Sequence, residues 1–292
     1  MKPAPFEYFR PRSLDEALSL LAEHGSDAKP LAGGQSLIPA MNFRLATPAV
    51  LVDLNELREL SHISDVDGEI RIGGMVRQRA TECNELVAER APLLAETMPH
   101  IAHPAIRNRG TIGGSLAHAD PAAELPAVML ALKATLVVKS KSETREIPSG
   151  DFFVGLFSTS VQTGELLTEI RIPPPVARSG YSFQEISRRH GDFALVGVAA
   201  AVQLDGKGRC EDARVALLSV GDRPVLAEEA SKALIGQAPS VESIRAAADA
   251  AATRDIDPSS DIHASARYRR QLANVLTRRV LERAFERAAL SR

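Results

Sequence analysis

The feature of the sequence that most constrains its fold is a pair of glycine-rich segments, each ending near a hydroxyl side chain. The first glycine loop reads Ala32-Gly33-Gly34-Gln35-Ser36-Leu37, and the second reads Thr111-Ile112-Gly113-Gly114-Ser115. Glycine admits positive φ and lets a ligand approach main-chain N–H groups closely. Successive N–H groups of this kind form a concavity that binds anions. One Gly-Gly pair usually marks only a tight turn, but two such loops predict the two sides of one long, phosphate-bearing ligand.

Neither loop carries a common nucleotide fingerprint. The sequence contains no Gly-x-x-x-x-Gly-Lys-Ser/Thr loop, and neither glycine loop matches the dinucleotide pattern Gly-x-Gly-x-x-Gly. The site must therefore belong to a different nucleotide fold. After the second loop, Asp120-Pro121 predicts the start of a helix, with Asp120 as N-cap and proline at the first helical position. Asp120 could serve only as that cap, and Glu124 could be only an exposed helix charge.

Composition narrows the function classes. The chain of 292 residues has a net charge of −2 and 4% aromatic residues, which argues against a nucleic-acid-binding surface. Its apolar runs are too short for a membrane span. The two cysteines, Cys83 and Cys210, lie far apart, which is typical of reduced thiols in a cytoplasmic protein. They cannot supply the usual four ligands of an iron–sulfur cluster, and no metal-ligand spacing is visible.

The order of the predicted elements indicates an α+β chain with two domains. Residues 1–56 read as a small β-α-β unit, in which Ser13-Leu14-Asp15-Glu16 is a capping box that starts a helix. Residues 57–175 contain alternating strand patterns around the second glycine loop. Pro173-Pro174-Pro175 cannot continue a ladder and predicts a domain boundary. Residues 176–292 read as antiparallel strands followed by helices, and we interpret the seven arginines of the last helix as its solvated face, or else as a docking face for a partner.

Together with the flanking residues, these motifs resemble a known family. The first glycine loop, the segment from Arg107 to Ser115 and Ala117-His118-Ala119-Asp120-Pro121 are similar to the FAD-binding medium subunit of molybdenum hydroxylases. Carbon monoxide dehydrogenase flavoproteins and the flavin domain of xanthine dehydrogenase share this pattern. The segment from Arg188 to Val196 resembles the start of the family's C-terminal domain. The resemblance implies a two-subdomain PCMH-type FAD-binding domain over residues 1–175, followed by a smaller α+β domain over 176–292.

The resemblance also implies a cofactor site. FAD would bind noncovalently between the two loops, with its pyrophosphate against backbone N–H groups, and this chain would hold no metal and no catalytic side chain. Position 35 is Gln where relatives often carry His, and Gln184 stands near a position where some relatives have Lys. The cofactor-binding residues carried over are Ala32, Gly33, Gly34, Gln35, Ser36, Leu37, Ile101, Thr111, Ile112, Gly113, Gly114, Ser115, Asp120, Glu124, Leu167 and Gln184.

The function implied is that of an electron-transfer flavoprotein subunit. Partner chains would bring the other cofactors: a large subunit with molybdopterin and a small subunit with [2Fe-2S] clusters, in a heterotrimer that could dimerise. Two alternatives stay open. A free-standing FAD-dependent oxidoreductase would need a substrate base or proton donor over the flavin, and a non-catalytic nucleotide-binding partner protein would hold a flavin that is never reduced.

Overall fold

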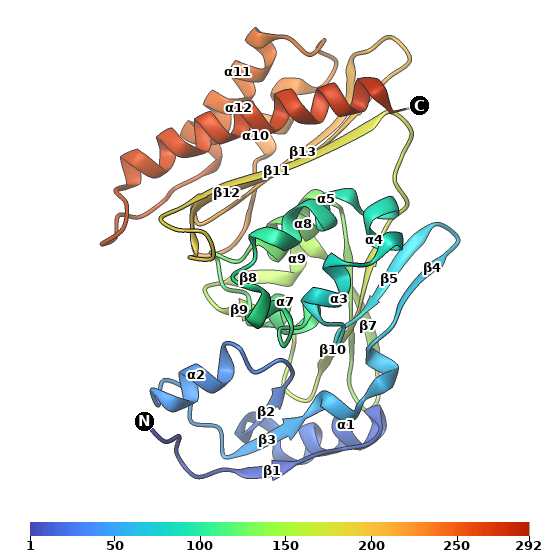
Figure 1. Cartoon of the computed structure of the whole chain (residues 1–292), viewed down its shortest axis with the longest axis vertical. Coiled ribbons are helices and arrows are strands. Elements are labelled where there is room, and N and C mark those ends of the chain that lie inside the picture. The colour runs from blue at the N-terminus through green and yellow to red at the C-terminus, as the bar shows by residue number, and fades with distance from the viewer. Residues whose placement is uncertain (292) are drawn as a thin grey trace.

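Three main sheets follow one another along the long axis of the molecule, and helices fill the spaces between them (Figure 1). The computed structural model describes residues 1–291. The buried apolar residues form three clusters, which are centred on the N-terminal, central and C-terminal parts of the chain. The α+β class that the sequence predicts is confirmed.

The N-terminal sheet is a parallel β-α-β unit in the order β1-β3-β2. Ser13 accepts a hydrogen bond from the Glu16 backbone N–H at 3.2 Å, so the predicted helix cap is present. The parallel order places the carboxyl ends of β2 and β3 side by side, and β2 leads directly into the first glycine loop. The elements of this unit are β1 (Glu7–Phe9), α1 (Leu14–His24), β2 (Ala28–Leu31), α2 (Leu37–Asn42) and β3 (Val50–Asp53).

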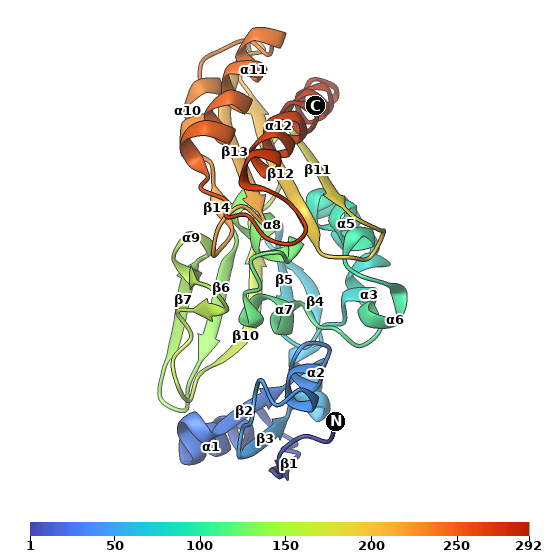
Figure 2. The same cartoon turned by 90° about the vertical axis from the view of Figure 1, so that its left-hand side faces the viewer.

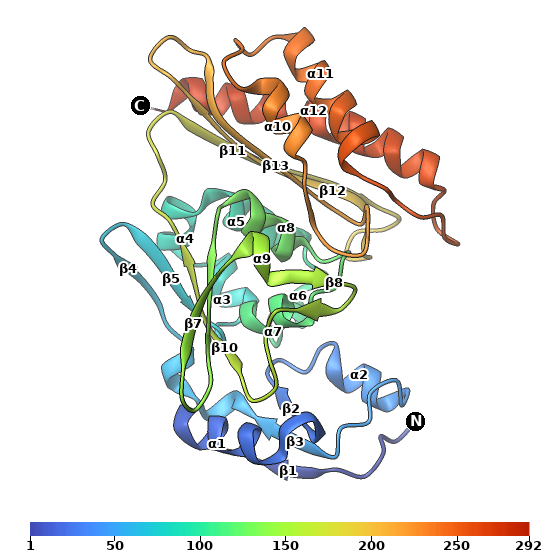
Figure 3. The same ribbon diagram turned by 180° about the vertical axis from the view of Figure 1, so that it is seen from behind.

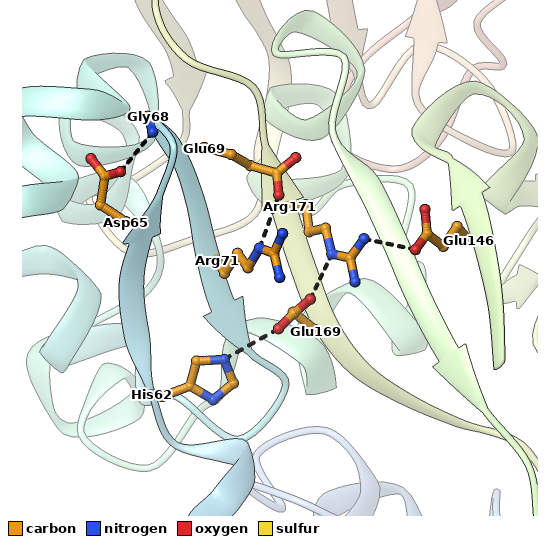
Figure 4. Close-up of polar contacts among 8 residues, drawn as sticks. All are labelled: His62, Asp65, Gly68, Glu69, Arg71, Glu146, Glu169 and Arg171. Atoms are coloured by element: carbon orange, nitrogen blue, oxygen red, sulfur yellow. Dashed lines mark hydrogen bonds and ion pairs between the residues drawn. The ribbon is translucent and has the colours of Figure 1, made fainter.

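The central sheet is antiparallel, and its two faces differ in chemistry. Its strands, in the order β4-β5-β10-β6-β7, are β4 (Ile63–Val66), β5 (Glu69–Gly73), β10 (Leu166–Ile172), β6 (Thr135–Lys139) and β7 (Thr144–Pro148). Because strand residues alternate between faces, Ile70 and Ile170 enter the core. The other face carries charged pairs such as Arg71 with Glu69 and Arg171 with Glu169 and Glu146 (Figure 4).

Short helices cover the apolar face of the central sheet. They are α3 (Gln78–Glu82), α4 (Glu85–Arg90), α5 (Pro92–Thr97), α6 (Pro104–Arg107), α7 (Ile112–His118), α8 (Glu124–Ala131) and α9 (Ser149–Phe152), and the last leads into the hairpin of β8 (Phe153–Gly155) and β9 (Ser158–Thr159).

One helix start in this region differs from the predicted one, and a second helix start was not predicted. The predicted helix start at Asp120 is wrong: Ala123 is the N-cap of α8, and the Asp120 carboxylate instead accepts the Ala122 N–H at 2.9 Å in a turn. The second glycine loop is itself the beginning of a helix, since Thr111 is the N-cap of α7. Because α7 ends at His118, it is a separate helix from α8, which begins four residues after Asp120.

The C-terminal sheet lies between two sets of helices (Figures 2 and 3). One face packs on α5 and α8, and the other is covered by α12. Phe183 and Leu218 from this sheet consequently belong to the central apolar cluster. The domain boundary at 175/176 stays a prediction, and the two domains that it would define share part of their apolar core. The strands are antiparallel, as predicted: β11 (Ser179–Ser187), β12 (Ala194–Leu204), β13 (Cys210–Leu218) and β14 (Val225–Leu226), with helices α10 (Glu228–Leu234), α11 (Val241–Ala250) and α12 (Ala266–Leu290).

The arginines of α12 are not simply a solvated face. Arg269 is buried, and its guanidinium donates to the carbonyls of Leu195 and Ser219 and to the Asp261 carboxylate at 2.6 Å. Arg287 donates to the Glu96 carboxylate, which ties α12 to α5. Within residues 1–291, none of the helices is both long and apolar enough to cross a membrane.

Candidate functional site

The two glycine loops touch each other, and glycine is what permits the contact. A Cβ atom on Gly33 would lie 2.8 Å from the Cα atom of Gly110, and a Cβ atom on Gly114 would lie 3.4 Å from the Cβ atom of Ala32. The two loops, which are 74 or more residues apart in sequence, therefore form adjacent walls of one site. Of the glycines in the two loops, only Gly34 has positive φ, at 72°.

Several of these glycines are needed for packing within the protein rather than for room around a ligand. A Cβ atom on Gly113 would meet the carbonyl oxygen of Gly74 at 2.6 Å, and one on Gly114 would meet Thr111 Oγ1 at the same distance. The prediction that glycine in the second loop serves ligand approach is therefore incomplete. Any side chain at these two positions would first collide with the chain itself.

The backbone N–H groups of the second loop are hydrogen-bonded within the described part of the chain, whereas those of the first loop are not. In the second loop, the N–H groups of Ile112, Gly113, Gly114 and Ser115 all donate within the protein, to Val76 O, Gly74 O, Thr111 Oγ1 and Thr111 O at 3.0 to 3.2 Å. In the first loop, the N–H groups of Gly33 to Leu37 have no acceptor within residues 1–291. The expectation that both loops present N–H donors thus holds only for residues 33–37, because a row of unpaired donors is what an anion requires.

The second loop contributes hydroxyls instead. Ser115 Oγ makes no hydrogen bond with the described part of the chain, and Thr111 Oγ1 accepts only the Gly114 N–H, which leaves its own proton to donate. Ser36 Oγ in the first loop is likewise without a partner in residues 1–291. The Gln35 side-chain amide donates to the Gly33 carbonyl at 3.2 Å and stabilises the first loop from within.

A hydrogen-bond network that the sequence did not predict holds the two loops together. The Asn55 amide donates to the Ala32 carbonyl of the first loop at 3.1 Å, and its oxygen accepts from Arg77 Nη2 at 2.6 Å. Arg77 Nη1 in turn donates to the carbonyl of Arg109, next to the second loop. The Asp53 carboxylate accepts from both Asn55 and Tyr8. This chain of bonds fixes the spacing between the loops.

A cavity of about 440 Å³ opens beside the first loop. Three polar residues in its wall, Asp53, Asn55 and Arg109, were not among the predicted site residues. The sequence did contain a signal for the first two: Asp53 ends the buried parallel strand β3 and Asn55 follows it, and the carboxyl ends of such strands form binding crevices. The cavity is lined by Leu31, Ala32, Gly33, Gly34, Gln35, Ile38, Pro39, Asp53, Asn55 and Arg109.

Glu124 lies apart from this cavity, in a second group of ionisable residues. It is the first residue of α8 and is only 7% exposed. Burial, reinforced by the neighbouring Glu185 and Asp120 carboxylates, raises the pKa of Glu124 to about 8. Glu185 Oε1 lies 3.7 Å from His100 Nδ1, and its other oxygen is buried without a partner in residues 1–291. The alternative that Glu124 is an exposed helix charge is wrong.

The remaining predicted residues differ in how closely the structure links them to the loops. Leu167 lies beside Gly74, which packs on the second loop. Ile101 is buried, and its carbonyl accepts from Arg107 Nη1 at 2.7 Å, just before that loop. Gln184 is on the α12 side of β11, because Gly180 on the same face abuts α12 and strand residues alternate. The structure does not bring the Gln184 side chain to the loops, whereas the adjacent Glu185 faces Glu124.

The donor set fits a dinucleotide cofactor. Unpaired N–H groups, a free hydroxyl on each loop and an arginine in the cavity wall can replace the water that a pyrophosphate loses on burial. The positive φ of Gly34 lets the main chain turn without a Cβ in the cradle. The apolar side chains of Leu31 and Ile38 in the same wall suit the less polar parts of such a ligand.

Comparisons with known proteins agree with this geometry. Residues 4–175 match the family described as the FAD binding domain in molybdopterin dehydrogenase, and residues 181–284 match the CO dehydrogenase flavoprotein C-terminal domain. The chain is 44% identical to 6-hydroxypseudooxynicotine dehydrogenase complex subunit alpha of Paenarthrobacter nicotinovorans, covering 99% of this chain and 97% of that protein. It is 40% identical to the carbon monoxide dehydrogenase medium chain of Afipia carboxidovorans, covering 99% of each.

The solved structures give the same result. The chain superposes on a chain of carbon monoxide dehydrogenase from Hydrogenophaga pseudoflava with a TM-score of 0.95 and 39% identity, covering 98% of this chain and 99% of the other. Both the resemblance and the FAD-binding fold expected from the sequence are confirmed. The chain therefore belongs to the family of FAD-binding medium subunits of molybdopterin-dependent dehydrogenases.

Proposed function

We propose that this chain is the electron-transfer subunit of a molybdenum hydroxylase complex. It would hold FAD noncovalently so that electrons from the iron–sulfur clusters of a small partner subunit reach an external acceptor. A large partner subunit with the molybdenum cofactor would oxidise the substrate. The observation that carries the proposal is the row of unpaired N–H groups at residues 33–37, held against the second glycine loop by the Asn55–Arg77 network.

The residues of this chain would bind and orient the cofactor rather than react themselves. The first loop and the hydroxyls of Ser36, Thr111 and Ser115 would hold the pyrophosphate, and Glu124, Ile101 and Leu167 would contact the remainder. FAD supplies the redox chemistry when it is bound, while the protein supplies binding, orientation and electrostatics. Burial raises the pKa of Glu124 to about 8, which favours the protonated carboxyl as a hydrogen-bond donor.

The test of cofactor identity uses the purified full chain. We expect about one FAD per chain, released into the filtrate when the yellow protein is denatured and filtered. Flavin that stays on the polypeptide would contradict noncovalent binding, and a mononucleotide flavin in the filtrate would contradict the pyrophosphate site.

The test of the subunit role asks what the chain does alone. The isolated chain, free of molybdenum and iron by metal analysis, should be reduced by dithionite and should pass electrons to an artificial dye. It should show no turnover with the substrate classes of its relatives, including carbon monoxide, purines and aldehydes. Turnover by the single chain would favour the free-standing oxidoreductase, and a bound flavin that dithionite cannot reduce would favour the non-catalytic partner protein.

A further inference from the structure

Arg109 stands out among the charged residues around the cavities. It lines the cavity beside the first glycine loop, yet its guanidinium makes no hydrogen bond or ion pair with residues 1–291. The arginines of the second cavity are different: Arg71 pairs with Glu69 at 3.0 Å, and Arg171 pairs with Glu169 at 2.6 Å. A guanidinium that protein carboxylates leave unpaired in a cavity wall is available for an anionic ligand.

The surroundings of Arg109 concentrate positive charge at this wall. Arg77 lies close by and donates to the Arg109 carbonyl. Burial and the nearby Arg109 charge both lower the pKa of Arg77. The one carboxylate in the cavity wall, Asp53, already accepts hydrogen bonds from Tyr8 and Asn55. The Asp53 charge acts in the opposite direction on the pKa of Arg77, but no carboxylate within residues 1–291 forms an ion pair with either guanidinium, so an anion at this wall would be stabilised by both.

Three residues of the first loop that have unpaired N–H groups line the same cavity, which is a second observation that favours an anionic ligand there. Gly33, Gly34 and Gln35 line it together with Arg109, and their N–H groups have no acceptor in the described chain. Planar guanidinium and backbone N–H groups are complementary to phosphate oxygens.

We propose that Arg109 is a phosphate-recognition residue, whose guanidinium pairs with the pyrophosphate of the dinucleotide while the first loop supplies N–H donors to the same group. The proposal rests on the FAD-binding role above and extends it, since the resemblance that identifies the glycine loops assigns nothing to this side chain. Arg109 is exposed at the cavity mouth, so it would also attract the anionic ligand from solution.

The test compares ligands with and without phosphate on the full chain stripped of flavin. For Arg109→Met we expect the FAD dissociation constant to rise about tenfold or more, with the same loss for ADP as a competitor. Riboflavin, which has no phosphate, should bind Arg109→Met and the unsubstituted chain equally. The dependence of FAD affinity on salt should also become shallower. Arg109→Lys should recover part of the affinity, because lysine keeps the charge but not the bidentate geometry.

The matched control is Arg71→Met, which removes an arginine from the wall of the second cavity and should leave all three affinities unchanged. Wild-type FAD affinity in Arg109→Met would overturn the proposal, as would an equal loss of FAD and riboflavin binding. If the unsubstituted chain binds ADP through Arg109 but binds no flavin, the phosphate site stands and the FAD role fails. Arg109→Gln repeats the measurement should the methionine variant fold poorly.

Discussion

Replacing Gly33 by alanine tests whether contact between the two loops sets cofactor affinity. The added Cβ would lie 2.8 Å from the Cα of Gly110 and also against the carbonyl of Arg109. Both obstacles are backbone atoms, so no flexible side chain can move aside. Ordinary carbon contact needs about 3.5 Å, so the loops must separate by more than half an ångström or the backbone must strain.

The expected loss of FAD affinity depends on the hydrogen bonds that oppose separation of the two loops. The Asn55 bond to Ala32 and the Arg77 bond to the Arg109 carbonyl hold the loops at their present spacing. Overpacking of this kind costs about 1–3 kcal/mol. If the two loops must return to their present spacing to bind FAD, this cost weakens binding by roughly five- to hundredfold, at 1.4 kcal/mol per factor of ten.

The assay pairs flavin titration of the apo chain with urea unfolding of the same sample. Gly150→Ala is the matched control, because a Cβ at Gly150 would have no atom within 4 Å and this glycine does not have positive φ. We expect the control to keep its affinity. If Gly33→Ala binds FAD as tightly as Gly150→Ala does, contact between the loops does not control the site, and the reasoning is refuted.

Three further substitutions have defined outcomes. The pKa of Glu124 is about 8 in the folded chain, above its ordinary value of 4.5, so the free energy of unfolding of the apo chain should fall by up to about 5 kcal/mol as pH rises from 4.5 through 8. Glu124→Gln should flatten this dependence in urea titrations at pH 5 and 9, and an unchanged slope would contradict it. Arg107→Met removes a buried guanidinium bonded to Glu82 at 2.9 and 3.1 Å; because Arg79 still pairs with Glu82 at 2.9 Å, stability should fall by about 1–3 kcal/mol, and an unchanged free energy of unfolding in the same assay would show that the pair is dispensable. Ser36→Ala removes a hydroxyl with no partner in residues 1–291, so apo stability should stay constant while FAD binding weakens by about 1 kcal/mol; a fall in apo melting temperature would mean that this serine is structural.

Much of the fold could be predicted because its signals are local. The Ser13–Glu16 capping box and the apolar run at Val50 sufficed for the β-α-β unit, and the alternation of Tyr181 to Ser187 sufficed for an antiparallel strand. The helix start at Asp120 was predicted wrongly because an Asp carboxylate that accepts from the N–H two residues ahead can form a turn as well as cap a helix. Asp120 accepts from the Ala122 N–H, and α8 begins at Glu124.

The candidate site was predictable in its loops but not in what supports them. No sequence pattern reveals that Gly113 and Gly114 use their N–H groups internally, because the acceptors at Gly74 and Thr111 are set by tertiary packing and by a cap. Asn55 and Arg77 were missed for the same reason, since their partners lie 22 to 32 residues away. Gln184 was predicted from the family resemblance, whereas the strand alternation and the effect of Glu185 on the pKa of Glu124 show that the neighbouring Glu185 lies on the side of Glu124.

The unequal hydrogen bonding of the two glycine loops has a thermodynamic consequence. The second loop enters the complex already ordered, because its N–H groups from Ile112 to Ser115 are bonded within the chain. Residues 33–37 must exchange solvent for ligand oxygens, so the loss of backbone hydration on binding falls mainly on them. The two glycine loops, which have similar sequences, therefore differ in how much backbone hydration they lose on binding, and the heat of cofactor binding should respond more to changes in residues 33–37 than to changes in residues 112–115.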